Sequence, residues 1–86
     1  MPNKSYGCLN LGDAYKSNKE YEKSLKFYTK ALKDPSCENL ALFKRAWLLY
    51  QINNYDDSEK DFKKILESDP ENVKAYFYLG KINLKL

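Results

Sequence analysis

The residue types that most often perform catalysis or bind metals are scarce in this chain. There is no histidine, the commonest general base and metal ligand. Cys8 and Cys37 therefore have no imidazole partner, and two cysteines alone do not make a structural zinc site. We interpret Cys8 as a small apolar residue at a helix interface and Cys37 as a loop thiol. No catalytic residue, metal site or cofactor is predicted, and we do not expect an enzyme.

The densest group of carboxylates consists of Asp56, Asp57, Glu59 and Asp61. Neighbouring carboxylates can perform acid–base chemistry, which makes the group worth testing against a simpler explanation. It lies at the expected start of a helix, where the helix dipole favours negative charge. Helix capping and solvation explain the group, so we predict no active site there.

Basic residues form one regular pattern. The lysines step by four, three, four and three residues, which places them on one face of a helix: Lys19, Lys23, Lys26, Lys30 and Lys33. Such a face can attract an acidic partner or nucleic acid through charge. With Glu20 and Glu22 nearby, the pattern favours a solvated helix surface.

Composition limits the class of protein. The chain has 86 residues with 43% hydrophobic and 31% charged content, which is ordinary for a globular domain. Its net charge of +3 does not indicate a nucleic-acid-binding protein. No apolar run approaches the length of about 18 residues expected of a membrane span. The start, MPNKSYG, lacks an apolar signal segment, and only two cysteines are present. We therefore predict a reducing compartment, the cytoplasm.

The elements that position these residues are helices. Apolar residues at helical spacing predict five of them, at 5–17, 20–33, 38–51, 54–67 and 71–86, with no strands. Pro35 ends the second helix because the residue before a proline is disfavoured in the helical conformation. Asn54 is predicted as the N-cap of the fourth helix. The turns are short, so consecutive helices are expected to be antiparallel.

The sequence is self-similar at a fixed step of about 34 residues, which we call the period. Tyr21 corresponds to Tyr55, and Gly12 corresponds to Ala46 and then to Gly80. A constant period of this length predicts a stacked helical repeat.

Three partial motifs follow this period. The first copy reads Cys8-x₂-Leu11-Gly12-x₂-Tyr15, then Ser24-x₃-Tyr28, Ala31 and Pro35; the second reads Leu42-x₂-Arg45-Ala46-x₂-Leu49, then Ser58-x₃-Phe62, Ile65 and Pro70; the third reads Tyr76-x₂-Leu79-Gly80-x₂-Asn83. The chain resembles the tetratricopeptide-repeat family over nearly all of its length. The resemblance implies one all-α domain, 1–86, a right-handed superhelical stack of antiparallel helix pairs. Its parts are repeat 1 (5–38), repeat 2 (39–72) and the first helix of an incomplete repeat 3 (73–86).

Two positions of the motif bear on packing. Gly12, Ala46 and Gly80 are small and allow two helices to approach closely. Ser24 and Ser58 stand where the family usually has alanine. We expect each serine to hydrogen-bond to a carbonyl one turn earlier in its own helix, at a slight cost in stability.

In the resembled family, the first helices of successive repeats line a concave groove that holds a peptide. The register assigns to this groove Tyr6, Leu9, Asp13 and Lys16; Leu40, Phe43, Lys44, Trp47 and Tyr50; and Lys74, Phe77, Tyr78, Lys81 and Leu84. Aromatic side chains beside lysines suit a peptide with large apolar and some acidic side chains. Alternatively, these aromatics are buried in the core or covered by another copy of the chain.

Two narrower functions of similar families fit less well. Some tetratricopeptide domains clamp a chaperone's C-terminal carboxylate with two lysines, two asparagines and an arginine. Those places hold Leu9, Asp13, Lys44, Lys74 and Tyr78, so only Lys74 matches. Pentatricopeptide repeats of similar length bind RNA. The segment YEKSLKFYTKAL before a proline turn looks like the protein-binding family, and we do not expect nucleic acid.

The last predicted helix is apolar on more than one side, with Tyr76, Leu79 and Ile82 on one and Phe77 and Leu84 on another. A terminal repeat usually presents a polar outer face. A longer array, a second copy of the chain or a groove-bound partner would each explain the difference. The sequence thus predicts a non-enzymatic protein-interaction module or, alternatively, a self-associating repeat unit.

Overall fold

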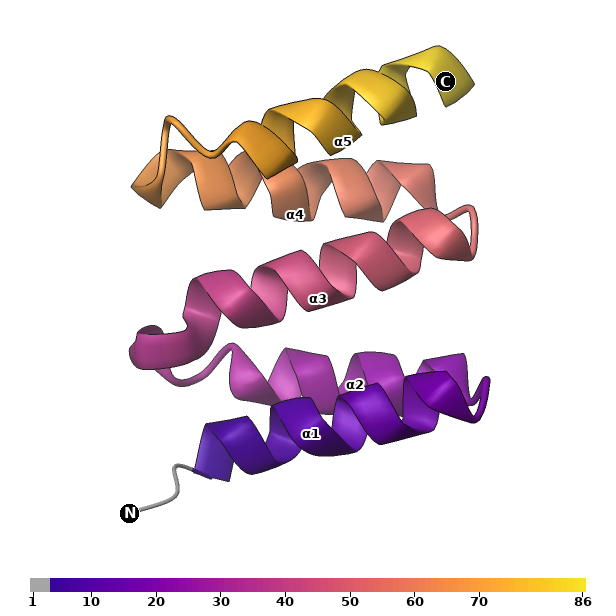
Figure 1. Cartoon of the computed structure of the whole chain (residues 1–86), viewed down its shortest axis with the longest axis vertical. Helices are drawn as coiled ribbons and strands as arrows, with labels where there is room; N and C mark the ends of the chain where they lie inside the picture. The colour runs from indigo at the N-terminus through magenta and orange to yellow at the C-terminus, as the bar shows by residue number, and fades with distance from the viewer. Residues whose placement is uncertain (1–3) are drawn as a thin grey trace.

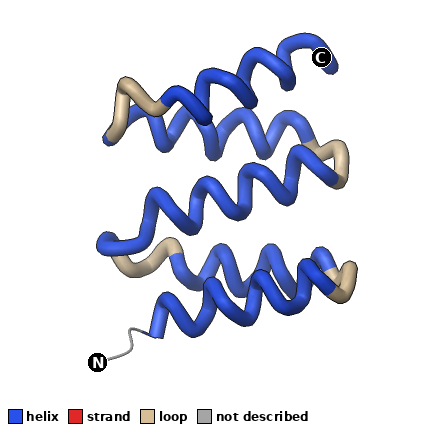
Figure 2. The backbone as a smooth tube through the Cα atoms, in the orientation of Figure 1, coloured by secondary structure: helices blue, strands red, loops and turns tan. Residues whose placement is uncertain are grey.

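The computed structural model describes residues 4–86, so the first three residues of the MPNKSYG stretch lie outside it. The elements are α1 (Lys4–Ser17), α2 (Tyr21–Ala31), a 3₁₀ helix η1 (Pro35–Cys37), α3 (Glu38–Gln51), α4 (Tyr55–Ser68) and α5 (Val73–Lys85). Each α-helix packs against the next one along the chain, and consecutive helices run in opposite directions (Figure 1). Figure 2 shows no strand in the described part of the chain. The predicted all-α stack of antiparallel helix pairs is confirmed.

Helix positions follow the sequence period. α3 begins and ends one period after α1, and α4 begins one period after α2. The expected second helix, 20–33, started one residue too early and ended two residues too late. It ends at Ala31 because Leu32 and Lys33 donate to carbonyls only three residues earlier, at Thr29 and Lys30. The expected fifth helix started two residues too early, because Asn72 caps it by accepting a hydrogen bond from the backbone N–H of Ala75 at 2.9 Å.

The turn between the two helices of a repeat has the same geometry in both copies. Lys19 and Asn53, which occupy equivalent positions in the two repeats, adopt left-handed φ angles of 63° and 68°. The next residue donates to a carbonyl five residues back, closing each first helix as a Schellman motif. Asn54 occupies the N-cap position of α4, but its side chain makes no capping bond. Its amide instead donates to Asp57 at 3.0 Å.

The core consists of two clusters that follow the repeats. The first contains Leu9, Tyr28, Ala31, Cys37, Ala41 and Leu48, and the second contains Leu42, Ala46, Phe62, Ile65, Ala75 and Ile82. Leu32 packs against both, which joins the repeats. Cys8 packs against the first cluster as expected. The prediction of Cys37 as a loop thiol is wrong, because η1 turns it into the core.

The small residues of the first helices bring the paired helices into close contact. A Cβ atom on Gly12 would overlap Cε1 of the Tyr28 ring. Ser24 Oγ donates to the Gly12 carbonyl, and Ser58 Oγ to the Ala46 carbonyl, both at 2.7 Å. Each buried serine therefore bonds across to the facing helix, not back along its own helix as predicted, because the close approach brings that carbonyl within reach. Each of these hydrogen bonds joins the two helices of one repeat.

Candidate functional site

Five of the residues predicted for the groove line one surface hollow. Phe43 and Trp47 reach it from α3, and Lys74, Phe77 and Tyr78 reach it from α5. The hollow encloses about 390 Å³ and is mainly apolar. Phe77 is 49% exposed, whereas Phe43, Trp47 and Tyr78 are half-buried. α3 and α5 thus present a shared aromatic surface, which we call the groove.

The aromatic rings of the groove are held by the core. Tyr78 stacks on the buried Phe62 with ring centroids 5.3 Å apart. It also makes edge contacts with Phe43 at 6.0 Å and Tyr50 at 5.8 Å. Ring pairs of this geometry are favourable beyond their burial and restrict side-chain rotation. Tyr50 continues the surface into an adjoining hollow that it shares with Lys81, Leu84 and Lys85.

Three lysines lie over the rings of this surface. Lys16 Nζ is 4.3 Å from the Trp47 ring centroid, Lys74 Nζ is 5.8 Å from that of Phe43, and Lys81 Nζ is 4.6 Å from that of Phe77. A cation over an aromatic face is attracted by its negative charge density. Burial lowers the pKa of Lys16, and the nearby Lys44 lowers it further against the opposing charge of Asp13. The groove is therefore aromatic and basic.

Asp13 and Lys44, both predicted for the groove, pair with each other. Lys44 Nζ donates to the two Asp13 carboxylate oxygens at 3.2 and 3.0 Å, and the Tyr28 hydroxyl donates to the same carboxylate. Burial alone would raise the pKa of Asp13, but the hydrogen bonds from Tyr28 and Lys44 outweigh it and hold this pKa below its ordinary value. Burial and the adjacent Asp13 raise the pKa of Tyr28 well above its usual range. Asp13 on α1 is thus bonded to Tyr28 on α2 and to Lys44 on α3, and these contacts link the three helices.

Leu9 is the predicted groove residue that the structure removes from the surface. Its side chain is 2% exposed and belongs to the first core cluster, because it packs between its own helix and the helices that follow. The flanking positions Tyr6, Leu40 and Leu84 are exposed, at 47%, 45% and 89%. The residues brought together are therefore Phe43, Trp47, Tyr50, Lys74, Phe77, Tyr78 and Lys81, with Lys16 at one end.

The paired helices, their period and the small residues at their contacts agree with comparisons to known proteins. Family models described as tetratricopeptide repeat match residues 5–34 and 43–86. This chain belongs to the tetratricopeptide-repeat family. Repeats of this family generally mediate protein–protein interaction.

The tetratricopeptide-repeat chain is also similar to a larger protein. It is 32% identical over 81 residues to anaphase-promoting complex subunit 3 of Schizosaccharomyces pombe. The aligned region covers 94% of this chain and 12% of that relative, so the chain spans a small part of the relative's length.

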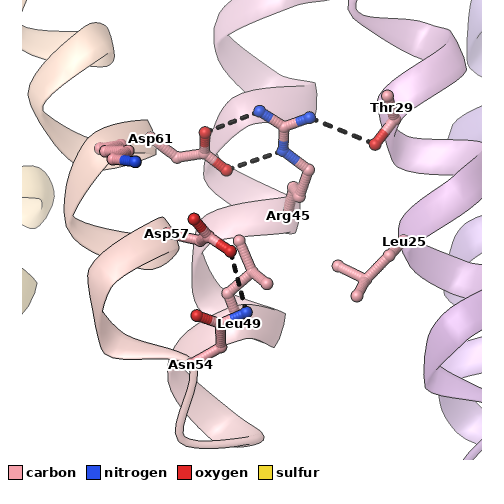
Figure 3. Close-up of a pocket in the computed structure, with 8 residues that line it drawn as sticks. Leu25, Thr29, Arg45, Leu49, Asn54, Asp57 and Asp61 are labelled. Atoms are coloured by element: carbon pink, nitrogen blue, oxygen red, sulfur yellow. Dashed lines mark hydrogen bonds and ion pairs between the residues drawn. The ribbon is translucent and has the colours of Figure 1, made fainter.

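Sequence reasoning missed a second hollow of this tetratricopeptide-repeat chain. It lies between α2, α3 and α4 and is lined by Leu25, Thr29, Arg45, Leu49, Asn54, Asp57, Lys60 and Asp61 (Figure 3). Arg45 donates from Nε and Nη2 to the two Asp61 oxygens, each at 2.7 Å, and from Nη1 to Thr29 Oγ1 at 3.2 Å. The hydrogen bond to Asp61 raises the pKa of Arg45 further, against the effect of burial.

The interpretation of Asp61 as a solvated carboxylate is wrong, since it is only 6% exposed and paired with Arg45. The sequence contained one signal for the pairing of Arg45. Arg45 stands in the register where the first repeat has Leu11 and the family motif has leucine. A charge at a usually apolar position requires a partner.

Metal-binding groups and membrane-spanning helices are two further features that bear on function. Among residues 4–86, no group of three or more histidine, cysteine, aspartate or glutamate side chains lies close enough together to hold a metal ion. None of the described helices is both long enough and apolar enough to cross a bilayer.

Proposed function

We propose that this chain is a single non-enzymatic protein-interaction module whose groove binds a segment of a partner protein. The observation that carries the proposal is the hollow lined by Phe43, Trp47, Lys74, Phe77 and Tyr78. The segment would place a large apolar side chain among these rings. Its acidic side chains would pair with Lys74 and Lys81, which lie over two of the rings.

The aromatic side chains of the groove are preorganised for binding. Tyr78 is fixed by Phe62 beneath it and by Phe43 and Tyr50 beside it, so few side-chain rotations are lost when a partner binds. Aromatic residues in such settings supply much of the energy of protein interfaces. Leu9, Asp13 and Lys44 have no direct role in this proposal, because the first is buried and the other two neutralise each other. A chaperone carboxylate clamp is therefore not proposed.

Two observations bear on the setting of this function. The similar S. pombe protein is by its name a subunit of a complex, which supports protein partners for this chain too. Cys8 and Cys37 are both free thiols, in keeping with the cytoplasm as the proposed compartment.

A peptide selection tests the groove. Random peptides displayed on phage are selected on the wild-type chain, and the enriched peptides are then titrated against Phe77→Ala and Tyr76→Ala. These neighbouring aromatics are 49% and 55% exposed on α5, but only Phe77 lines the hollow. We expect peptides that combine aromatic or large aliphatic residues with aspartate or glutamate. Phe77→Ala should weaken their binding about tenfold or more, and Tyr76→Ala should change it less than about twofold. Equal binding by both variants would rule out the groove.

Self-association is the second candidate function. α5 exposes much apolar surface, with Val73, Tyr76 and Leu84 exposed at 78%, 55% and 89%. Exposed apolar patches often mark interfaces, and a twofold symmetric dimer would cover this one. Light-scattering mass after size exclusion at several concentrations, on wild type and Trp47→Ala, separates the two functions. A dimer supports self-association, through the groove if it dissociates in Trp47→Ala and through the exposed face of α5 if it does not. A monomer at every concentration supports the open groove.

A further inference from the structure

The hollow of Figure 3 faces away from the groove. On α3 the groove is lined by Phe43 and Trp47, whereas this hollow is lined by Arg45 and Leu49. Successive residues of an α-helix are rotated by about 100°, so positions two apart lie on nearly opposite sides. α3 thus separates two distinct surfaces. We call the second one the inter-repeat cleft, lined by Leu25, Thr29, Arg45, Leu49, Asn54, Asp57, Lys60 and Asp61.

The inter-repeat cleft has an apolar part and a polar part. Leu25 from α2 and Leu49 from α3 supply the apolar side chains. Arg45 and Thr29 supply the polar part, and the hydrogen bond from Arg45 to Thr29 across the cleft joins α2 of repeat 1 to α3 of repeat 2. The cleft encloses about 410 Å³, room for one large side chain of a bound segment.

Both helices that flank the cleft carry exposed lysines at equivalent positions. Lys26 and Lys30 follow directly after the lining residues of α2, and Lys60 and Lys64 are their counterparts one period later on α4. Within each helix the two lysines are four residues apart and share a face. The most buried carboxylate of the cleft, Asp61, is neutralised by Arg45. The lining itself carries two basic and two acidic side chains, Arg45 and Lys60 with Asp57 and Asp61, so the net positive charge around the cleft comes from Lys26, Lys30 and Lys64 beside it.

We infer that the inter-repeat cleft is a second docking site, which binds an acidic peptide segment. One apolar side chain of the segment would cover Leu25 and Leu49. Its carboxylates would pair with Lys26 and Lys30 on one side and with Lys60 and Lys64 on the other. The inference stands on residues separate from the groove and does not rest on the proposed function.

The cleft favours a peptide over a nucleic acid. The residues that line it include no aromatic ring on which a base would stack. Asp57 would repel phosphate groups, whereas a peptide can direct its apolar side chain toward that region. Backbone N–H groups of a peptide can also donate to the Asp57 carboxylate.

A labelled peptide of alternating glutamate and leucine residues tests the inference, with binding measured by fluorescence anisotropy. Every variant carries Phe77→Ala, which removes the groove contribution. The cleft variant adds Lys26→Glu with Lys60→Glu, and the matched variant adds Lys23→Glu with Lys63→Glu, which changes net charge equally on the same two helices at residues that line neither hollow. We expect the cleft variant to bind about fivefold or more weakly than Phe77→Ala alone, because two exposed ion pairs become repulsive, and the matched variant to change less than about twofold. Thr29→Phe, which fills the cleft without changing charge, should weaken binding similarly.

The single tryptophan separates this inference from the proposed function. Trp47 lines the groove and not the cleft, so in the Phe77→Ala background its emission should stay unchanged when the peptide binds the cleft. An emission shift together with equal affinity of the cleft and matched variants would overturn the inference and support groove binding instead. Full affinity in Thr29→Phe, absence of peptide binding, or displacement of the peptide by single-stranded RNA of mixed sequence would each overturn it as well.

Discussion

At the scale of single residues, the Asp13 carboxylate shows how a predicted surface charge becomes part of the structure. It accepts hydrogen bonds from Lys44 on α3 and Tyr28 on α2 while lying on α1. The register alone assigned Asp13 to the groove, as a residue that would face a bound peptide. In the folded chain Asp13 and Lys44 neutralise each other, and the remaining lysines give the groove its charge.

Asp13→Asn should change how stability depends on pH. The folded-state pKa of Asp13 is lowered, so its ionised form stabilises the fold above the unfolded-state pKa of about 3.9, and this contribution is lost as the pH falls through the folded-state value. We expect the free energy of unfolding of the wild type to exceed that of the variant by under about 1 kcal/mol at neutral pH. The difference is small because the Asp13 side chain is 40% exposed and solvent screens its pair with Lys44. Urea unfolding from pH 7 to pH 3 should show this difference shrinking below about pH 4. A difference that is constant with pH would contradict this role.

At the scale of helices, Gly12 and Gly80 occupy the same place in the repeat and have opposite surroundings. Gly12 faces the Tyr28 ring, whereas a Cβ atom on Gly80 would have no atom within 4 Å. Gly12 is therefore required by the contact between α1 and α2. Gly80 lies in the middle of α5 with no such contact among the described residues.

The two glycine-to-alanine substitutions should change stability in opposite directions. Gly12→Ala should cost about 1–3 kcal/mol, because the new methyl group would displace the buried Tyr28 ring. Gly80→Ala should stabilise by up to about 1 kcal/mol, because alanine favours an exposed helix interior. Urea unfolding of both variants beside wild type provides the measurement. A Gly12→Ala variant as stable as wild type would contradict the close-packing account.

At the scale of the whole molecule, the two repeats are joined by both apolar and polar contacts. Leu32 packs against both core clusters. Arg45 bonds to Asp61 within its own repeat and to Thr29 of the preceding one. The stack, with extents of 39 × 28 × 15 Å, is thin, so contacts of this kind matter for cooperative unfolding.

Arg45→Met should destabilise the chain by about 2–4 kcal/mol, because it leaves the buried Asp61 carboxylate without its partner. The double variant Arg45→Met with Asp61→Leu should recover most of this loss, since an apolar pair of similar volume replaces the ion pair. Urea unfolding of wild type, single and double variants tests both expectations. A double variant as unstable as the single one would show that the loss comes from something other than the unpaired carboxylate.

Much of the fold was predictable from the sequence because it depends on local periodicity. Apolar residues at helical spacing identified all five helices, and the constant period placed equivalent side chains in register. The gathering of Phe43, Trp47, Phe77 and Tyr78 at one hollow follows from the same register. Helix ends were less so, since they depend on capping bonds such as that of Asn72.

Only the tertiary structure decided how deeply equivalent residues are buried. Leu9, Phe43 and Phe77 share one register position, yet Leu9 is 2% exposed, Phe43 is half-buried and Phe77 is 49% exposed. Their exposure depends on which helices pack over each position, and a repeating sequence does not contain that information. The pairing of Arg45 with Asp61 was hidden for the same reason, because it joins two helices whose relative rotation is set by packing. The sequence by itself determined the helices, their period and the family. Their packing decided which side chains remain available to a partner.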